Sequence, residues 1–103
     1  MKSEIVWTRG AEGDLLHLYN QIGDHDAALK ILRDPLDHSL ELLSQFPALG
    51  AHVHGTTRVR RLLTGYKRRF ALFYVQEGNR VFVHAFLDTR QDPDAIARRL
   101  RGL

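Results

Sequence analysis

Basic side chains gather in one stretch of the chain, where they could act on a phosphate group or on an acidic partner. The segment from Arg58 to Arg69 contains six Lys or Arg residues and no Asp or Glu. Guanidinium groups can stabilise a phosphorane during RNA cleavage, and they also bind phosphates and carboxylates without chemistry. Arg90 is a further candidate because it is predicted to follow the end of a strand. The alternative is a set of solvated charges, and charge alone does not separate the two possibilities.

Cleavage of RNA would also require a general base and a general acid, and the histidine candidates for these roles are weak. His84 is predicted to lie in the middle of a strand, where we interpret it as a packed core histidine. His52 and His54 could ligate a metal with a third group, but no third ligand is evident, and we interpret them as solvated. The remaining histidines fall on predicted helices and are interpreted as surface or structural residues: His17, His25 and His38. Because cysteines and Gly-rich phosphate loops are also absent from the sequence, we expect no metal and no cofactor.

A basic turn with an aromatic residue is a second possible contact surface. Tyr66, Lys67 and Arg68 lie between two predicted strands, and Arg69 follows them. Such a turn suits a contact with nucleic acid or with a protein target, and it equally suits a charged turn that only keeps the protein soluble. The complete set of predicted target-contact residues is Arg58, Arg60, Arg61, Tyr66, Lys67, Arg68 and Arg90.

The length and composition favour one ordinary globular domain over residues 1–103. The net charge is only +3, but the acidic residues concentrate in the first half of the chain, which suggests a basic face. No apolar run approaches the roughly 20 residues that span a bilayer, and the first residues lack the apolar core of a signal peptide. We therefore expect a cytoplasmic protein without a membrane partner.

The first half of the chain is predicted to form a short strand and a helical hairpin. Glu4–Thr8 reads as the strand, with Thr8 as the N-cap of a helix that ends at Gly23. A second helix carries an apolar stripe from Ala28 to Leu43, and Pro35 lies inside it. Because the stripe keeps its phase across the proline, we predict one kinked helix and not two separate ones.

The second half is predicted to form an antiparallel meander and a final helix, after an irregular loop that runs to Gly55. The strands are expected at Thr57–Leu63, Arg69–Gln76 and Arg80–Leu87. Strict alternation in the last strand would place Val81, Val83, Ala85 and Leu87 on one face and Phe82, His84 and Phe86 on the other. Asp92 and Pro93 start a helix that is expected to reach Leu103. The predicted fold class is α+β, in the order β-α-α-β-β-β-α, with the helical hairpin packed on an antiparallel sheet.

Several short motifs in this order resemble the ParE-like toxins of the RelE/ParE superfamily of type II toxin–antitoxin systems. They are the Trp-Thr entry to the first helix, Ala-x-x-Asp-Leu at Ala11–Leu15, Val-Arg-x-Leu at Val59–Leu62, and Leu-x-x-Arg-x-Asp-Pro at Leu87–Pro93. The resemblance covers nearly the whole chain. It implies a growth-inhibiting toxin, associated with plasmid stabilisation, that is neutralised by a cognate ParD-like antitoxin.

The resemblance also bears on the target of the toxin. RelE-like members cut messenger RNA on the ribosome with basic residues and a C-terminal tyrosine or histidine, whereas ParE-like members poison DNA gyrase. Ala71 and Ile96 stand near positions where RelE-like toxins carry an arginine and the tyrosine, and Arg90 matches a basic position of both branches. We therefore expect inhibition of DNA gyrase through its trapped DNA cleavage complex, with no catalytic residues; the alternative is a ribosome-dependent mRNA endoribonuclease. Asp88 departs from the histidine usual in ParE-like chains.

Overall fold

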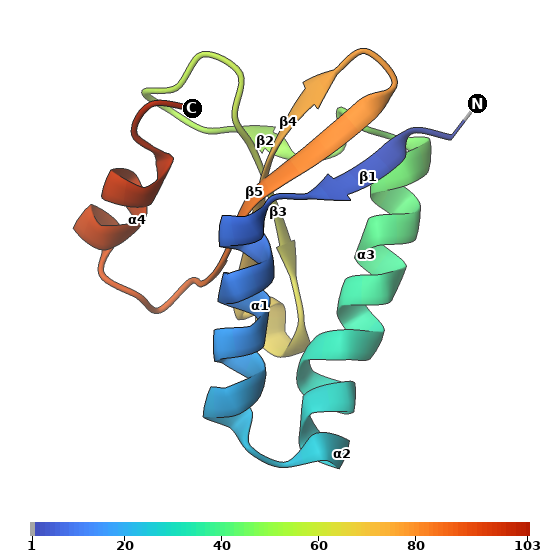
Figure 1. Ribbon diagram of the computed structural model, residues 1–103, viewed down its shortest axis with the longest axis vertical. Helices are drawn as coiled ribbons and strands as arrows, with labels where there is room; N and C mark the ends of the chain where they lie inside the picture. The colour runs from blue at the N-terminus through green and yellow to red at the C-terminus, as the bar shows by residue number, and fades with distance from the viewer. Residues whose placement is uncertain (1) are drawn as a thin grey trace.

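A computed structural model describes residues 2–103 as a five-stranded sheet with helices on both faces (Figure 1). The elements are β1 (Glu4–Trp7), α1 (Arg9–Ile22), α2 (His25–Ala28), the π-helical turn η1 (Leu29–Arg33), α3 (Asp34–Gln45), β2 (Ala51–His52), β3 (Arg60–Thr64), the 3₁₀ turn η2 (Tyr66–Arg68), β4 (Phe70–Glu77), β5 (Arg80–Asp88) and α4 (Pro93–Leu100). The strand order is β1-β5-β4-β3-β2. This is the expected α+β fold, with the helical hairpin on one face and α4 on the other.

Three details of the sheet and the last helix differ from the sequence expectation. β1 pairs parallel to β5, so the sheet is mixed; the two strands are far apart in the chain, and no hairpin restricts their direction. The predicted loop contains β2, a short edge strand paired with β3, and β3 begins at Arg60 and not at Thr57. α4 ends at Leu100 because the backbone becomes extended at Arg101 and left-handed at Gly102.

The helix across Pro35 is continuous, as the apolar stripe predicted. α2, η1 and α3 follow one another without a loop, and the junction residues Arg33 and Asp34 have right-handed helical backbone angles. The distortion takes the form of a single π turn immediately before the proline, in which the Asp34 N–H donates to the Leu29 carbonyl. Since Pro35 offers no N–H and crowds the preceding turn, a widened turn lets the helix pass the proline without breaking.

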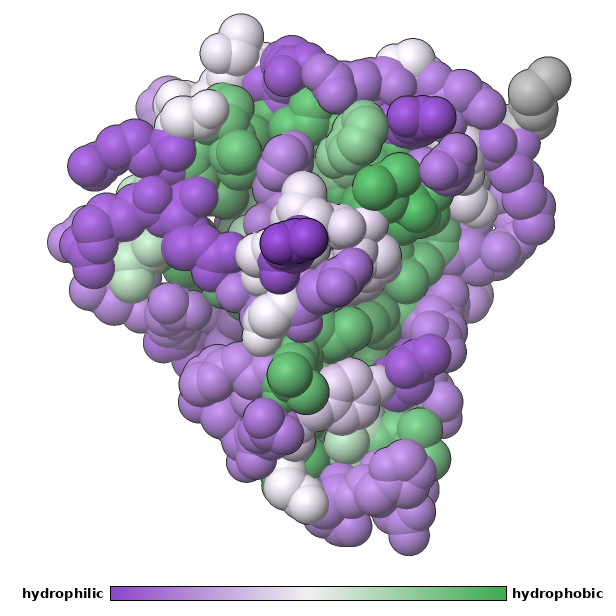
Figure 2. Space-filling model, in the orientation of Figure 1, coloured by the Kyte–Doolittle hydropathy of each residue, from purple (hydrophilic) through white to green (hydrophobic). Residues whose placement is uncertain are grey.

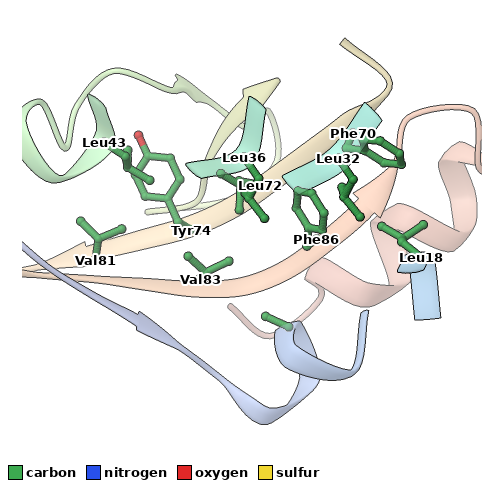
Figure 3. Packing of buried hydrophobic residues seen from close by; sticks show 11 residues of the cluster. Leu18, Leu32, Leu36, Leu43, Phe70, Leu72, Tyr74, Val81, Val83 and Phe86 are labelled. Atoms are coloured by element: carbon green, nitrogen blue, oxygen red, sulfur yellow. The ribbon is translucent and has the colours of Figure 1, made fainter. Parts of the chain in front are cut away.

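The main hydrophobic core lies between the helical hairpin and the sheet (Figure 3). Tyr74 crosses this core from β4, and its hydroxyl accepts from Gly50 N and donates to the Pro47 carbonyl, both at 2.8 Å. Gly50 has no room for a side chain, since an added Cβ would lie 2.8 Å from the Tyr74 hydroxyl. These contacts fix the connection from α3 to β2 against the sheet.

A β-bulge at His84 changes which face of the sheet the end of β5 uses. Val83 pairs with Tyr74 and Ala85 pairs with Phe73, so His84 is the extra residue. Val81 and Val83 therefore lie in the core beneath the helical hairpin, whereas Ala85 and Leu87 lie in the second core beneath α4. The prediction that all four share one face is wrong, because strict alternation holds only in a strand without a bulge.

The bulge also corrects the interpretation of His84 as a core histidine. Its side chain is half-buried. Burial lowers its pKa, the Arg58 charge adds to this effect, and the Glu77 carboxylate opposes it. Phe82 and Trp7 are likewise only half-buried.

Candidate functional site

The three basic residues at the start of β3 do not form one surface. Arg60 donates to the carbonyl oxygens of Gly50 at 2.8 Å and Ala48 at 3.3 Å, so it supports the loop before β2. Arg61 comes next in an alternating strand and therefore projects to the opposite face, where it lines a cavity beneath α4. Arg58 lies before the strand and pairs with Glu77, with 2.9 Å between Nη1 and Oε1. The sequence run thus separates into three different environments.

The other basic residues come together where β4 begins and β5 ends. The Thr89 N–H donates to the Arg69 carbonyl at 2.7 Å, which places the two strand ends side by side. The Asp88 carboxylate joins two guanidinium groups, with Arg69 Nε at 3.0 Å and Arg90 Nη2 at 2.9 Å from the same oxygen. Its other oxygen accepts from the backbone N–H of Arg90 at 2.8 Å and from its Nε at 3.2 Å. Asp88 therefore orients Arg90 through both its backbone and its side chain.

The charge of Asp88 is maintained by these partners. Burial alone would raise the pKa of the carboxyl group, but the hydrogen bonds from Arg90 and Arg69 outweigh it and lower the pKa to about 2. Arg69 was not among the predicted contact residues, and the role of Asp88 as its partner was missed, because the pairing depends on the register between β4 and β5. The Leu-x-x-Arg-x-Asp-Pro motif contained Asp88 but gave no sign of this contact.

The turn between β3 and β4 presents further cations next to this pair. Lys67 and Arg68 both have left-handed backbone angles, with φ of 57° and 55°, and their side chains are exposed. Tyr66 is 61% exposed, and Lys67 Nζ lies 5.5 Å from the centre of its ring. We call the surface formed by Tyr66, Lys67, Arg68, Arg69 and Arg90 the cationic end of the sheet.

A second carboxylate ties α4 to the helical hairpin beside the cationic end. Asp14 on α1 accepts from the Phe86 N–H at 3.0 Å and from both terminal nitrogens of Arg99, at 2.7 and 2.8 Å. The ion pair raises the pKa of Arg99. A polar cleft of about 610 Å³ lies between α1 and the segment from β5 to α4, and its lining includes Asp14, His17, Gln21, Asp88, Arg90, Gln91 and Arg99. The cleft is thus continuous with Arg90.

An apolar cavity of about 560 Å³ lies on the other face of the sheet, beneath α4. Ala71, which is 2% exposed, and the half-buried Ile96 both line it. His54 and Arg61 supply polar groups to its lining, and no Asp or Glu does so in the part of the chain that the structure describes. The positions where a nuclease of this fold was expected to carry chemistry are therefore apolar here.

His52 lies at the end of β2, and its Nε2 lies 3.3 Å from the carbonyl of Thr57 in the loop before β3. Among residues 2–103 there is no group of three or more His, Cys, Asp or Glu side chains arranged to hold a metal ion. Over the same residues no helix has the length and hydrophobicity needed to cross a bilayer.

Comparisons with known proteins agree with this architecture. Residues 5–93 match the sequence model of a family described as the ParE toxin of the type II toxin–antitoxin system parDE. A search of curated proteins found no match. A solved structure described as the chromosomal ParDE toxin–antitoxin system from P. aeruginosa is similar in fold, with a TM-score of 0.67, 22% sequence identity and coverage of 84% of this chain and 96% of that chain. The family match spans most of the sequence, and the chain therefore belongs to the ParE toxin family of type II toxin–antitoxin systems.

Proposed function

We propose that this toxin acts in the cytoplasm by binding the complex of DNA gyrase with cleaved DNA, and that it performs no hydrolytic chemistry. The observation that carries the proposal is the apolar environment of Ala71 and Ile96 in the cavity beneath α4. General acid–base catalysis contributes about 10²–10⁴-fold to a reaction rate, and neither side chain can transfer a proton. We therefore assign the cationic end a role in binding the gyrase–DNA complex and not in catalysis.

In this mechanism Arg90 is the central contact residue. Its side chain is 66% exposed, yet it donates two hydrogen bonds to Asp88, which also accepts one from the Arg90 backbone N–H, and these contacts hold it in one orientation. A group held in its bound conformation loses little entropy when a partner arrives. If the toxin binds the cleaved state of the gyrase–DNA complex more tightly than the uncleaved state, it increases the population of the cleaved state. Of the predicted contact residues, Arg58 and Arg60 are engaged elsewhere within the toxin, and Arg61 lines the cavity beneath α4. We therefore assign the contact to Arg90 and the η2 turn.

One arrangement favours the alternative function, an mRNA endoribonuclease. His54 and Arg61 line the same cavity, so a base and a cation could face one substrate there. Under this alternative His54→Ala would abolish cleavage of messenger RNA in a ribosome-containing extract. Under the gyrase proposal the same variant would keep full activity against gyrase.

Two assays on the purified toxin separate the proposals. One measures DNA supercoiling by gyrase, and the other measures cleavage of messenger RNA in an extract that contains ribosomes. We expect the toxin to abolish supercoiling by gyrase and to leave messenger RNA intact. The Arg90→Ala variant should inhibit supercoiling less strongly. Arg80→Ala is the matched control, because Arg80 is an exposed residue at the opposite end of β5. Cleaved messenger with normal supercoiling would refute the gyrase proposal.

A cognate antitoxin is the proposed second partner. The similar structure from P. aeruginosa is described as a ParDE toxin–antitoxin system, which supports such a pairing here. Hydrophobic residues also reach the surface between α1 and α3 (Figure 2), where an antitoxin segment could bury them. We expect poor yield and poor growth when the toxin is expressed alone, and rescue of both by co-expression of the adjacent antitoxin gene. Equal growth in the two cases would argue against a toxin.

A further inference from the structure

We propose that the cationic end of the sheet binds the phosphate backbone of DNA directly. The proposal rests on the proposed function above, because it identifies which component of the gyrase–DNA complex the toxin contacts. It also predicts an affinity for duplex DNA that can be measured without gyrase.

The first step is the local charge. Lys67, Arg68, Arg69 and Arg90 lie at this end of the sheet, and Asp88 is the carboxylate that Arg69 and Arg90 share, so four cations and one anion leave a local charge of +3. The whole chain has the same net charge of +3, so the remainder of the molecule is balanced. A concentrated positive surface on a nearly neutral protein attracts a dense line of negative charges such as DNA.

The second step is the orientation of the donors. Asp88 engages the Nε and Nη2 atoms of Arg90, while Nη1 makes no hydrogen bond to residues 2–103. The outer nitrogen of a fixed guanidinium therefore remains available for a phosphate oxygen. Lys67 and Arg68 are exposed by a turn in which both residues have left-handed backbone angles, a strained conformation for residues other than glycine. The turn is held by hydrogen bonds from Arg68 N to the Gly65 carbonyl and from Arg69 N to the Tyr66 carbonyl.

The third step is the choice between DNA and an acidic protein. Protein interfaces depend on a buried apolar centre from which charged residues are depleted. The cationic end lacks an apolar centre of this kind, because Tyr66 is its one large hydrophobic side chain and its other members are Lys67, Arg68, Arg69 and Arg90. Tyrosine hydroxyl groups, arginines and lysines are common donors to DNA phosphates. The polar cleft beside Arg90 adds the amides of Gln21 and Gln91, which suit the same acceptors.

The test measures binding of the toxin to a fluorescently labelled 20-base-pair duplex by anisotropy at several salt concentrations. Sequence-independent binding with Kd of about 10⁻⁴–10⁻⁶ M at physiological salt is expected. If each cation neutralises one phosphate, the slope of log K against log salt is about −3 to −4. Arg68→Ala and Arg90→Ala should each reduce the slope by about 1, whereas Arg80→Ala, which removes a charge at the far end of β5, should leave it unchanged.

Three outcomes would overturn the inference: no salt-dependent binding, an equal effect of Arg80→Ala and Arg90→Ala, or equal binding of an unstructured polyglutamate peptide of the same charge as the duplex. Circular dichroism melting of each variant excludes unfolding as the cause of a loss. Failure of this inference is distinguishable from failure of the proposed function. If the toxin inhibits gyrase but shows no salt-dependent binding to the duplex, the DNA contact is wrong and the gyrase target stands. If it binds the duplex through the cationic end but has no effect on gyrase, the gyrase target is wrong and the DNA contact stands.

Discussion

Asp14 connects three elements that the chain brings together only on folding, so its replacement should have a large effect on stability. Beyond the end of β1, the buried Phe86 has no strand partner on that side for its N–H, and Asp14 accepts the hydrogen bond instead. The same carboxylate holds Arg99 of α4 by two short hydrogen bonds. Asp14→Ala therefore leaves a buried N–H unsatisfied and removes the ion pair.

The magnitude follows from the two contacts. A hydrogen bond to a charged group contributes about 1.5–3 kcal/mol, and a partly exposed ion pair contributes about 0.2–1 kcal/mol. Asp14→Ala should thus lower the free energy of unfolding by about 2–3 kcal/mol, which for a domain of this size lowers Tm by about 10 °C. Asp14→Asn keeps an oxygen for the Phe86 N–H and should lose only about 1 kcal/mol.

Urea denaturation followed by circular dichroism measures these differences, with Arg99→Ala completing a double-mutant cycle. Arg99→Ala should lower the free energy of unfolding by about as much as Asp14→Asn, because both substitutions remove only the ion pair. If Asp14→Ala lowers the free energy of unfolding by less than about 0.5 kcal/mol, which is the range of neutral surface substitutions, the two contacts of Asp14 do not stabilise the fold as proposed. An equal loss of free energy of unfolding in Asp14→Asn and Asp14→Ala would also contradict this role, because only Asp14→Asn keeps an acceptor for the Phe86 N–H.

Three further predictions concern stability. Tyr74→Phe removes the hydroxyl that bonds Gly50 and Pro47, and should lower the free energy of unfolding by about 1–3 kcal/mol in urea titrations. Gly65→Ala should destabilise the protein in the same assay, because its φ is +87° and a Cβ would lie 2.4 Å from the Phe70 ring; Gly78→Ala, where a Cβ meets open space at a φ of +58°, is the control and should be milder. The pKa of Asp88 is about 2 in the folded chain and lower than its usual value, so its contribution to stability is complete above about pH 4 and disappears as the pH falls toward 2; Asp88→Asn should flatten this acid limb of the stability curve.

The sequence predicted most of the secondary structure because those signals are local. Thr8 and Asp92 cap their helices with side-chain hydrogen bonds to Ala11 N and Asp94 N, as residues of these types do in many proteins. Gly23 ends α1 with a positive φ. The second helix passes Pro35 because its apolar face continues on both sides, which the stripe also indicated.

The features that the sequence did not predict depend on distant residues. The bulge at His84 is recognisable only from the pairing of β5 with β4, and Asp14 completes the backbone bonding beside it. Arg60 supports the loop before β2, whereas Arg61 lines the cavity on the opposite face of the sheet. This difference depends on where β3 starts, which the run of basic residues in the sequence does not show. Of the candidate site, the turn and Arg90 could be proposed from residue type, whereas the shared contact of Arg69 and Arg90 with Asp88 required the fold.

We propose that this toxin traps gyrase on cleaved DNA, and the cleavage-complex assay tests this proposal most directly. Supercoiled plasmid is incubated with gyrase, ATP and the toxin, the reaction is stopped with detergent and protease, and linear DNA is quantified on a gel. We predict that linear DNA accumulates with increasing toxin and that Arg90→Ala reduces this accumulation while Arg80→Ala does not. Loss of supercoiling without linear DNA, or no effect on gyrase at all, would show that the toxin does not trap the cleavage complex.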